Sequence, residues 1–215
     1  MMKHLPNIIT LSRLVFMAVI AVLAFETWPG SATLVFFLCL AASISDWLDG
    51  YIARRCGYVT NFGKLMDAIA DKFMVVGLFL VLILNGLLYD GIEWLRITVW
   101  VILVATVLRD LFITALRMLA ARKGVVLAAD KMGKRKTIWQ STSICVLFFV
   151  PIIRRDLAFL HLPHVFELFV WLNGVLYYLL AGALAISSGV LYAMRYFPLL
   201  KSVPTATAVE DKELS

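Results

Sequence analysis

The stretch that decides the fold reads Asp46-Trp-Leu-Asp49-Gly50-Tyr-Ile-Ala53-Arg54 and, after eight intervening residues, Gly63-Lys-Leu-Met-Asp67-Ala-Ile-Ala-Asp71-Lys72. It places four carboxylates in a chain that is otherwise strongly apolar. At helical spacing, Asp46 and Asp49 share a face of one helix, and Asp67 and Asp71 share a face of the next. The connection between them is short, which predicts antiparallel neighbours with all four carboxylates at a similar depth.

The composition predicts an integral membrane protein. Of the 215 residues, 62% are hydrophobic and 16% are charged, and the mean hydropathy is +0.92. These values are unlike those of ordinary soluble domains, and a spanning helix needs about 20 apolar residues. We expect an all-α polytopic membrane protein, a bundle of six transmembrane helices with a short N-terminal juxtamembrane segment. Residues 1–200 should form a single domain and residues 201–215 a disordered cytoplasmic tail. The six predicted spans are 8–25, 31–53, 63–88, 97–121, 137–153 and 166–194.

The distribution of positive charge predicts the orientation. Lys and Arg gather before the first span, after the second and fourth spans, and in the tail, so these parts should face the cytoplasm. The opposite side carries Arg96, Arg154 and Arg155 beside several acidic residues. We therefore expect a multi-pass protein of the bacterial inner membrane whose carboxylates face the cytoplasm. The net charge of +6 favours anionic lipid head groups and phosphorylated substrates. Nucleic acid is not expected as a partner, because no recognition motif accompanies the basic residues.

Insertion of each carboxylate at the centre of a membrane span costs about 2.5–3.5 kcal/mol, so four of them indicate a structural or functional role. One reason would be structural ion pairing with Arg54, Lys64 and Lys72, and a second would be proton or cation transport. A third is a hard-cation site, in which two ions such as Mg²⁺ or Mn²⁺ clamp a phosphoryl displacement. Gly50 and Ala53 leave a notch beside the acids, and Arg54 offers a fork that matches phosphate oxygens. That combination favours the third reading, although small residues alone are also typical of helix packing.

The spacing of this stretch, Asp-x-x-Asp-Gly-x-x-Ala-Arg, eight residues, Gly-x-x-x-Asp-x-x-x-Asp, resembles the complete signature of the CDP-alcohol phosphotransferases. The resemblance implies a six-helix membrane enzyme, usually a homodimer, that transfers a phosphatidyl or similar group from a CDP-linked lipid to an alcohol and releases CMP. It implies that Asp71 is also the base that takes the acceptor's hydroxyl proton. The implied CDP pocket is lined by Gly50, Ala53 and Arg54. The implied ligands of two Mg²⁺ or Mn²⁺ ions are Asp46, Asp49, Asp67 and Asp71.

A second polar stripe concerns the acceptor alcohol. Asp110 and Arg117, seven residues apart, lie on nearly the same helix face, with Arg109 close by. Basic groups near a metal site suit an acceptor that carries a phosphate, whereas contact with anionic lipid is the alternative for each of them. The candidate ligands of the acceptor phosphate are Arg109, Arg117, Lys134 and Lys136.

Residues 6–140 resemble the phosphatidylglycerophosphate synthase branch of that family. The resemblance implies CDP-diacylglycerol and sn-glycerol 3-phosphate as substrates, and it adds Asn7 and Thr10 as substrate-binding candidates. Two positions depart from the branch: Asp110 stands where Glu is more frequent, and Ala68 where Pro is frequent. Within the family the alternatives are serine, inositol phosphate or phosphatidylglycerol as acceptor. Outside it they are a cation transporter and an intramembrane prenyltransferase.

Overall fold

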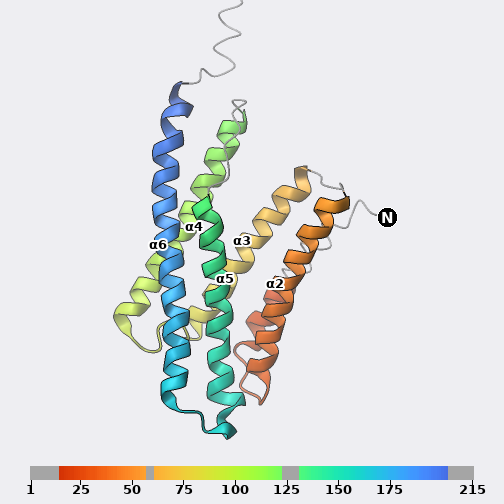
Figure 1. The fold of residues 1–215 in the computed structure, drawn as a ribbon, viewed down its shortest axis with the longest axis vertical. Helices are drawn as coiled ribbons and strands as arrows, with labels where there is room; N and C mark the ends of the chain where they lie inside the picture. Colours follow the sequence, from red (N-terminus) through yellow and green to blue (C-terminus); the bar gives the residue numbers. More distant parts are fainter. Residues whose placement is uncertain (1–14, 57–60, 123–130, 203–215) are drawn as a thin grey trace, which may run out of the picture. The chain divides into compact units, whose positions relative to one another are not determined.

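The computed structural model describes residues 15–56, 61–122 and 131–202 (Figure 1). Within these ranges, the side chains at 45–56, 61–69, 121–122, 131–132, 134 and 197–202 lie outside the described part. All regular structure in the described ranges is helical, without a strand. The predicted all-α class is therefore confirmed.

The helices follow the predicted order. Residues 15–23 form the first of them. Five long helices come next: α2 (Ser31–Cys56), α3 (Asn61–Leu84), α4 (Glu93–Arg122), α5 (Lys131–Pro151) and α6 (His164–Ser202). A π-helical turn, η2 (Ile152–Asp156), and a 3₁₀ turn, η3 (Ala158–Leu160), join α5 to α6. Among the described residues, three stretches are long and apolar enough to cross a membrane, namely Glu93–Ala120, Arg135–Asp156 and His164–Tyr196. The polytopic membrane class is confirmed as well.

Several helix ends differ from the predicted spans. Helix α5 begins at Lys131 rather than at residue 137, because Lys and Arg are good helix formers even where hydropathy falls. Helix α3 ends at Leu84 rather than at residue 88, because the chain turns at Gly86, whose φ is +73°. Helix α6 runs on to Ser202, so the predicted tail begins inside it, and residues 203–215 lie outside the described residues.

The chain divides into two compact units, which we describe one at a time. The first consists of Met1–Trp100 and Gln140–Tyr178. The second consists of Val101–Trp139 and Leu179–Ser215. Helices α4, α5 and α6 contribute residues to both units.

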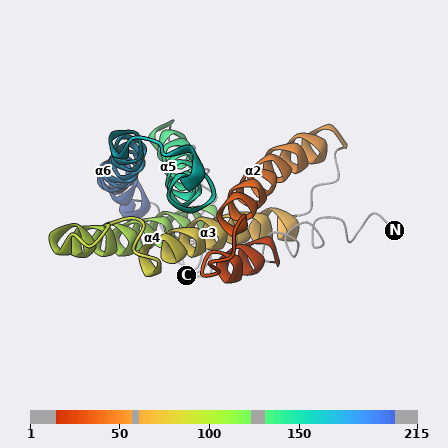
Figure 2. The ribbon, with the colours of Figure 1, turned by 90° about the horizontal axis from the view of Figure 1, so that it is seen from below.

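In the first unit, α5 and α6 lie side by side (Figures 1 and 2). The Ser143 hydroxyl donates to the Gly174 carbonyl at 2.8 Å, and a Cβ at Gly174 would lie only 2.7 Å from the Leu147 side chain. The Tyr178 hydroxyl fastens α6 to α4 by donating to the Val99 carbonyl at 2.8 Å. Small residues and polar side chains that reach a neighbouring backbone are the usual means by which membrane helices are held together.

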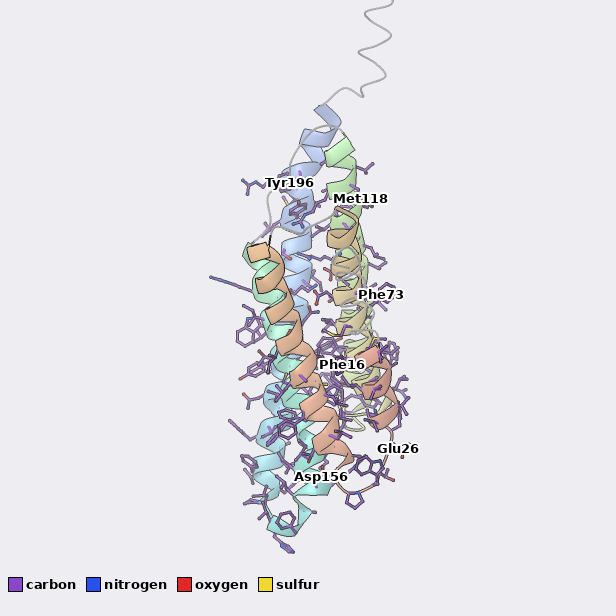
Figure 3. All side chains as sticks on the ribbon, turned by 90° about the vertical axis from the view of Figure 1, so that its right-hand side faces the viewer. Phe16, Glu26, Phe73, Met118, Asp156 and Tyr196 are labelled. Atoms are coloured by element: carbon purple, nitrogen blue, oxygen red, sulfur yellow. The ribbon has the colours of Figure 1, made fainter. Side chains whose placement is uncertain are left out.

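Asp156 holds the start of α2, at the end of this unit where Figure 3 labels both Asp156 and Glu26. Its carboxylate accepts hydrogen bonds from the backbone N–H groups of Gly30 at 3.0 Å and Thr33 at 2.8 Å, and from the Thr33 hydroxyl at 2.5 Å. A carboxylate at this position satisfies N–H groups that the helix itself leaves unpaired, and it complements the helix dipole. A residue far along the chain thus caps α2.

We expect Asp156→Ala to destabilise the protein by about 2 kcal/mol, because it removes three hydrogen bonds to a charged group and leaves the N–H groups of α2 without their acceptor. The melting temperature in detergent measures this loss. Thr98→Ala is a suitable control, because the Thr98 hydroxyl donates within its own helix, to the Trp94 carbonyl at 2.9 Å. Equal melting temperatures for the two variants would contradict the capping role.

Candidate functional site

The acidic stretch lies on two helices of the first unit. Asp46 and Asp49 belong to the C-terminal part of α2, and Asp67 and Asp71 to the N-terminal part of α3. Since both segments are helical, the members of each pair are about one turn apart along one face. The helical placement that the sequence predicted is therefore confirmed, with the two pairs near the ends that residues 57–60 connect.

The ligand set itself stays a prediction. Of the four aspartates, Asp71 has a described side chain, which is partly buried. Among the side chains that the structure describes, no group of three or more His, Cys, Asp or Glu could hold a metal ion. The predicted CDP-binding residues are on α2, with side chains outside the described part: Gly50, Ala53 and Arg54. Asn7 and Thr10 lie outside the described residues altogether.

The second unit brings three of the polar residues on α4 and α5 together. Asp110 lies between two cations: its Oδ1 accepts from Arg109 Nη1 at 2.8 Å, and its Oδ2 accepts from Lys136 Nζ at 2.6 Å. The side chains of Lys136, Arg109 and Asp110 are only 6%, 13% and 17% exposed. In such surroundings a charge is retained only with partners, because a buried charge that loses its partner is strongly destabilising. We call these three residues the α4–α5 charge cluster.

Helix α6 completes the surroundings of this cluster. Arg109 Nη2 donates to the Ser188 hydroxyl at 2.6 Å, and the Arg109 stem packs on Gly189. Arg109 Nε is buried, and no described residue is its hydrogen-bond partner. The sequence prediction did not include Ser188 or Gly189. Their only local signal is a small, polar run, Ser187-Ser188-Gly189, within an apolar helix.

Arg117 is held elsewhere in the same unit. Its Nε donates to the Tyr192 hydroxyl at 3.2 Å, and its guanidinium lies 5.6 Å from the centroid of the Tyr192 ring, a cation–π contact. Tyr192 is buried against Ile113, and its ring lies 4.5 Å from that of Tyr196. Figure 3 labels Tyr196 on α6 and Met118 on α4. The shared helix face predicted for Arg117 and Asp110 therefore does not place Arg117 in the α4–α5 charge cluster. Lys134 is on α5, with its side chain outside the described part.

The chain is similar in sequence to several proteins that are named as enzymes. It is 38% identical over 167 residues to the CDP-diacylglycerol–glycerol-3-phosphate 3-phosphatidyltransferase of Mycoplasma genitalium, a match that covers 77% of this chain and 65% of that enzyme. It is 31% identical over 175 residues to the Rickettsia typhi enzyme of the same name, covering 81% of this chain and 91% of the relative. It is 33% identical over 151 residues to a CMP-forming cardiolipin synthase of rice, covering 66% of this chain and 45% of the relative. The chain thus spans less than two thirds of the length of the Mycoplasma and rice relatives.

The match to a family model is more extensive. Residues 3–194 match the model of the CDP-alcohol phosphatidyltransferases, a range that includes the acidic stretch, the α4–α5 charge cluster and most of α6. This agrees with the family that the spacing of the acidic stretch predicted. The protein belongs to the CDP-alcohol phosphatidyltransferase family.

Proposed function

We propose that the protein transfers the phosphatidyl group of CDP-diacylglycerol to sn-glycerol 3-phosphate, giving phosphatidylglycerophosphate and CMP. The observation that favours a phosphorylated acceptor over a neutral alcohol is the α4–α5 charge cluster, in which Arg109 has a buried N–H without an acceptor among the described residues. The cationic side chains of such a cluster can bind the phosphate of a phosphorylated acceptor, whereas serine or another neutral alcohol offers them no phosphate. The names of the bacterial relatives support the same reaction.

For the donor side, we infer that two divalent ions, Mg²⁺ or Mn²⁺, are held by Asp46, Asp49, Asp67 and Asp71. The donor set fits, because carboxylate oxygens are the ligands that hard cations prefer. The bound ions would neutralise the diphosphate and favour departure of CMP. Gly50 and Ala53 leave room for the nucleotide, and Arg54 pairs with diphosphate oxygens. Asp71 also takes the proton of the attacking hydroxyl, so that no covalent intermediate is needed.

For the acceptor side, four basic residues would bind the phosphate of glycerol 3-phosphate. Arg109 and Lys136 are held in the α4–α5 charge cluster, and Arg117 is held by Tyr192. Their contacts limit the motion of long side chains before the ligand arrives, which lowers the entropic cost of binding. The fourth residue is Lys134.

Several general features belong to the same proposal. Residues 1–200 form one functional domain, and the protein acts as a homodimer in the bacterial inner membrane, with its active site facing the cytoplasm. The excess of Lys and Arg on the predicted cytoplasmic side supports this orientation. At the other predicted surface, Trp28 and Trp94 are 44% and 67% exposed, as is typical of aromatic residues at a membrane interface.

Removal of divalent cations should abolish turnover. Purified protein treated with EDTA should release no CMP, and addition of Mg²⁺ or Mn²⁺ should restore release, because the carboxylates alone cannot neutralise the diphosphate. Circular dichroism of the same samples controls for unfolding. CMP release that persists in EDTA would contradict the metal proposal.

The acceptor assay tests the reaction directly. Purified protein with CDP-diacylglycerol, Mg²⁺ and radiolabelled glycerol 3-phosphate should form labelled lipid and CMP in equal amounts. Phosphatidylglycerol is the second acceptor to try, because the rice relative is named a CMP-forming cardiolipin synthase. Transfer to phosphatidylglycerol or to serine, without transfer to glycerol 3-phosphate, would overturn the proposed acceptor. Ion flux without a nucleotide would instead favour a transporter.

A further inference from the structure

Helix α6 contacts Arg109 at two residues. The first is Ser188, which has no exposed surface. The Ser188 hydroxyl donates to the Ala185 carbonyl at 3.1 Å and accepts from Arg109 Nη2 at 2.6 Å. Because its single proton is used within α6, a lone pair is left to face the guanidinium. Ser188 is therefore a dedicated hydrogen-bond acceptor for Arg109.

The second meeting point is Gly189. A Cβ on this residue would lie 2.7 Å from Arg109 Cγ and 3.8 Å from Nε, so the Arg109 stem occupies the space that any other residue would fill. On the α5 side, a Cβ at Gly133 would lie 3.5 Å from Arg109 Nη2, which is an ordinary contact distance. The Arg109 side chain is thus packed between two glycines of different helices.

Together these contacts fix both terminal nitrogens of the guanidinium. Nη1 is bound to Asp110 and Nη2 is bound to Ser188, whereas Nε is buried beside Gly189 without a partner among the described residues. An arginine side chain otherwise carries about 2 kcal/mol of rotamer entropy, part of which is lost whenever it is ordered on a ligand. Fixing the side chain in advance removes that cost from the binding step.

We propose that Ser188 and Gly189 are positioning residues, which hold the Arg109 guanidinium in the orientation that binds the phosphate of the acceptor. This inference rests on the proposed function, since it assigns α6 to the acceptor site of the same reaction. It predicts that the two residues control affinity for the phosphorylated acceptor and leave affinity for CDP-diacylglycerol unchanged.

The first experiment removes the hydroxyl. Ser188→Ala should raise the KM for glycerol 3-phosphate about tenfold, as expected for loss of a hydrogen bond to a charged group, with the KM for CDP-diacylglycerol within about twofold of wild type. Ser188→Thr keeps the hydroxyl and should recover most of the loss. Ser187→Ala is the matched control, because the exposed Ser187 hydroxyl bonds to the Ala183 and Leu184 carbonyls of its own helix. An unchanged KM in Ser188→Ala, or an equal rise in Ser187→Ala, would overturn the role of Ser188.

The second experiment separates positioning from helix packing. Gly182→Ala disturbs the same pair of helices, because its new Cβ would lie 2.5 Å from the Ile102 side chain, and it does not touch Arg109. Both Gly189→Ala and Gly182→Ala should lower the melting temperature, and only Gly189→Ala should raise the KM for glycerol 3-phosphate. If the two variants have equal KM values for glycerol 3-phosphate, Gly189 acts only in helix packing, and its proposed positioning role is wrong.

The wild-type assay separates failure of the proposed function from failure of the positioning role. If the wild-type protein forms no lipid from glycerol 3-phosphate, the proposed function fails, and the inference fails with it. If wild type forms the product and the Ser188 and Gly189 variants keep its KM, only the inference fails. A rise in KM confined to Ser188→Ala and Gly189→Ala supports both.

Discussion

Asp71→Asn should lower kcat by about 10³-fold or more and leave the protein folded. A carboxamide has nearly the same shape as a carboxylate, but it carries no charge to hold a divalent cation and accepts no proton from a hydroxyl. Loss of a general base alone costs about 10²–10⁴-fold, and a weakened metal site adds to that loss. The measurement is CMP release under saturating CDP-diacylglycerol and glycerol 3-phosphate, with the melting temperature recorded on the same preparation.

A matched control for this variant lies in the same unit. Asp90 binds Arg154 through both carboxylate oxygens, at 3.0 and 3.1 Å, and its side chain is 43% exposed. Its φ of 45° is a left-handed conformation that Asn adopts readily, so Asp90→Asn makes the same chemical change without backbone strain. We expect Asp90→Asn to turn over at the wild-type rate. If Asp71→Asn also does so, Asp71 is neither base nor metal ligand, and ion pairing becomes the better account of the acidic stretch.

The helices and the acidic pairs could be predicted from the sequence because both depend on local spacing. Apolar stretches of about 20 residues predict membrane spans, and residues three or four positions apart share a helix face. Neither prediction depends on tertiary contacts. The start of α5 was predicted too late, because the apolar stretch begins only after Lys136, whereas the helix already begins at Lys131. Hydropathy measures preference for the membrane, whereas helix formation depends on the backbone and on side-chain entropy.

Contacts between distant parts of the chain could not be predicted in this way. Ser188 lies 79 positions after Arg109, and Asp156 lies 123 positions after Thr33. In the sequence, Ser188 reads as one more small residue in an apolar helix, and α6 offered no motif. Arg117 lies on nearly the same face of α4 as Asp110, but its partner is a tyrosine on α6, which the spacing on α4 could not identify. Helix spacing indicates which residues share a face, and tertiary packing decides which of them meet.

Arg109→Ala should lower kcat/KM for glycerol 3-phosphate by about 10²–10³-fold, the effect expected for truncating a buried, hydrogen-bonded charge. The loss should appear mainly as a higher KM for that acceptor, with the KM for CDP-diacylglycerol little changed. Arg96→Ala is the matched control, because Arg96 is 49% exposed and pairs with Glu93, at 2.7 Å on the surface of α4. A surface pair of this kind contributes at most about 1 kcal/mol, so the control should turn over normally.

The geometry of the cluster separates this effect from simple unfolding. When Arg109 is truncated, Asp110 keeps Lys136 at 2.6 Å, so the variant does not bury a lone carboxylate, and the melting temperature should fall less than the acceptor affinity does. Arg109→Lys is more informative than the alanine variant, because it preserves the charge but replaces a planar fork by one ammonium group, which cannot span Asp110 and Ser188 as the guanidinium does. If the site needs only positive charge, the lysine variant will bind glycerol 3-phosphate as wild type does. If it needs the oriented guanidinium, the lysine variant will lose most of the affinity that the alanine variant loses, which is the result we expect.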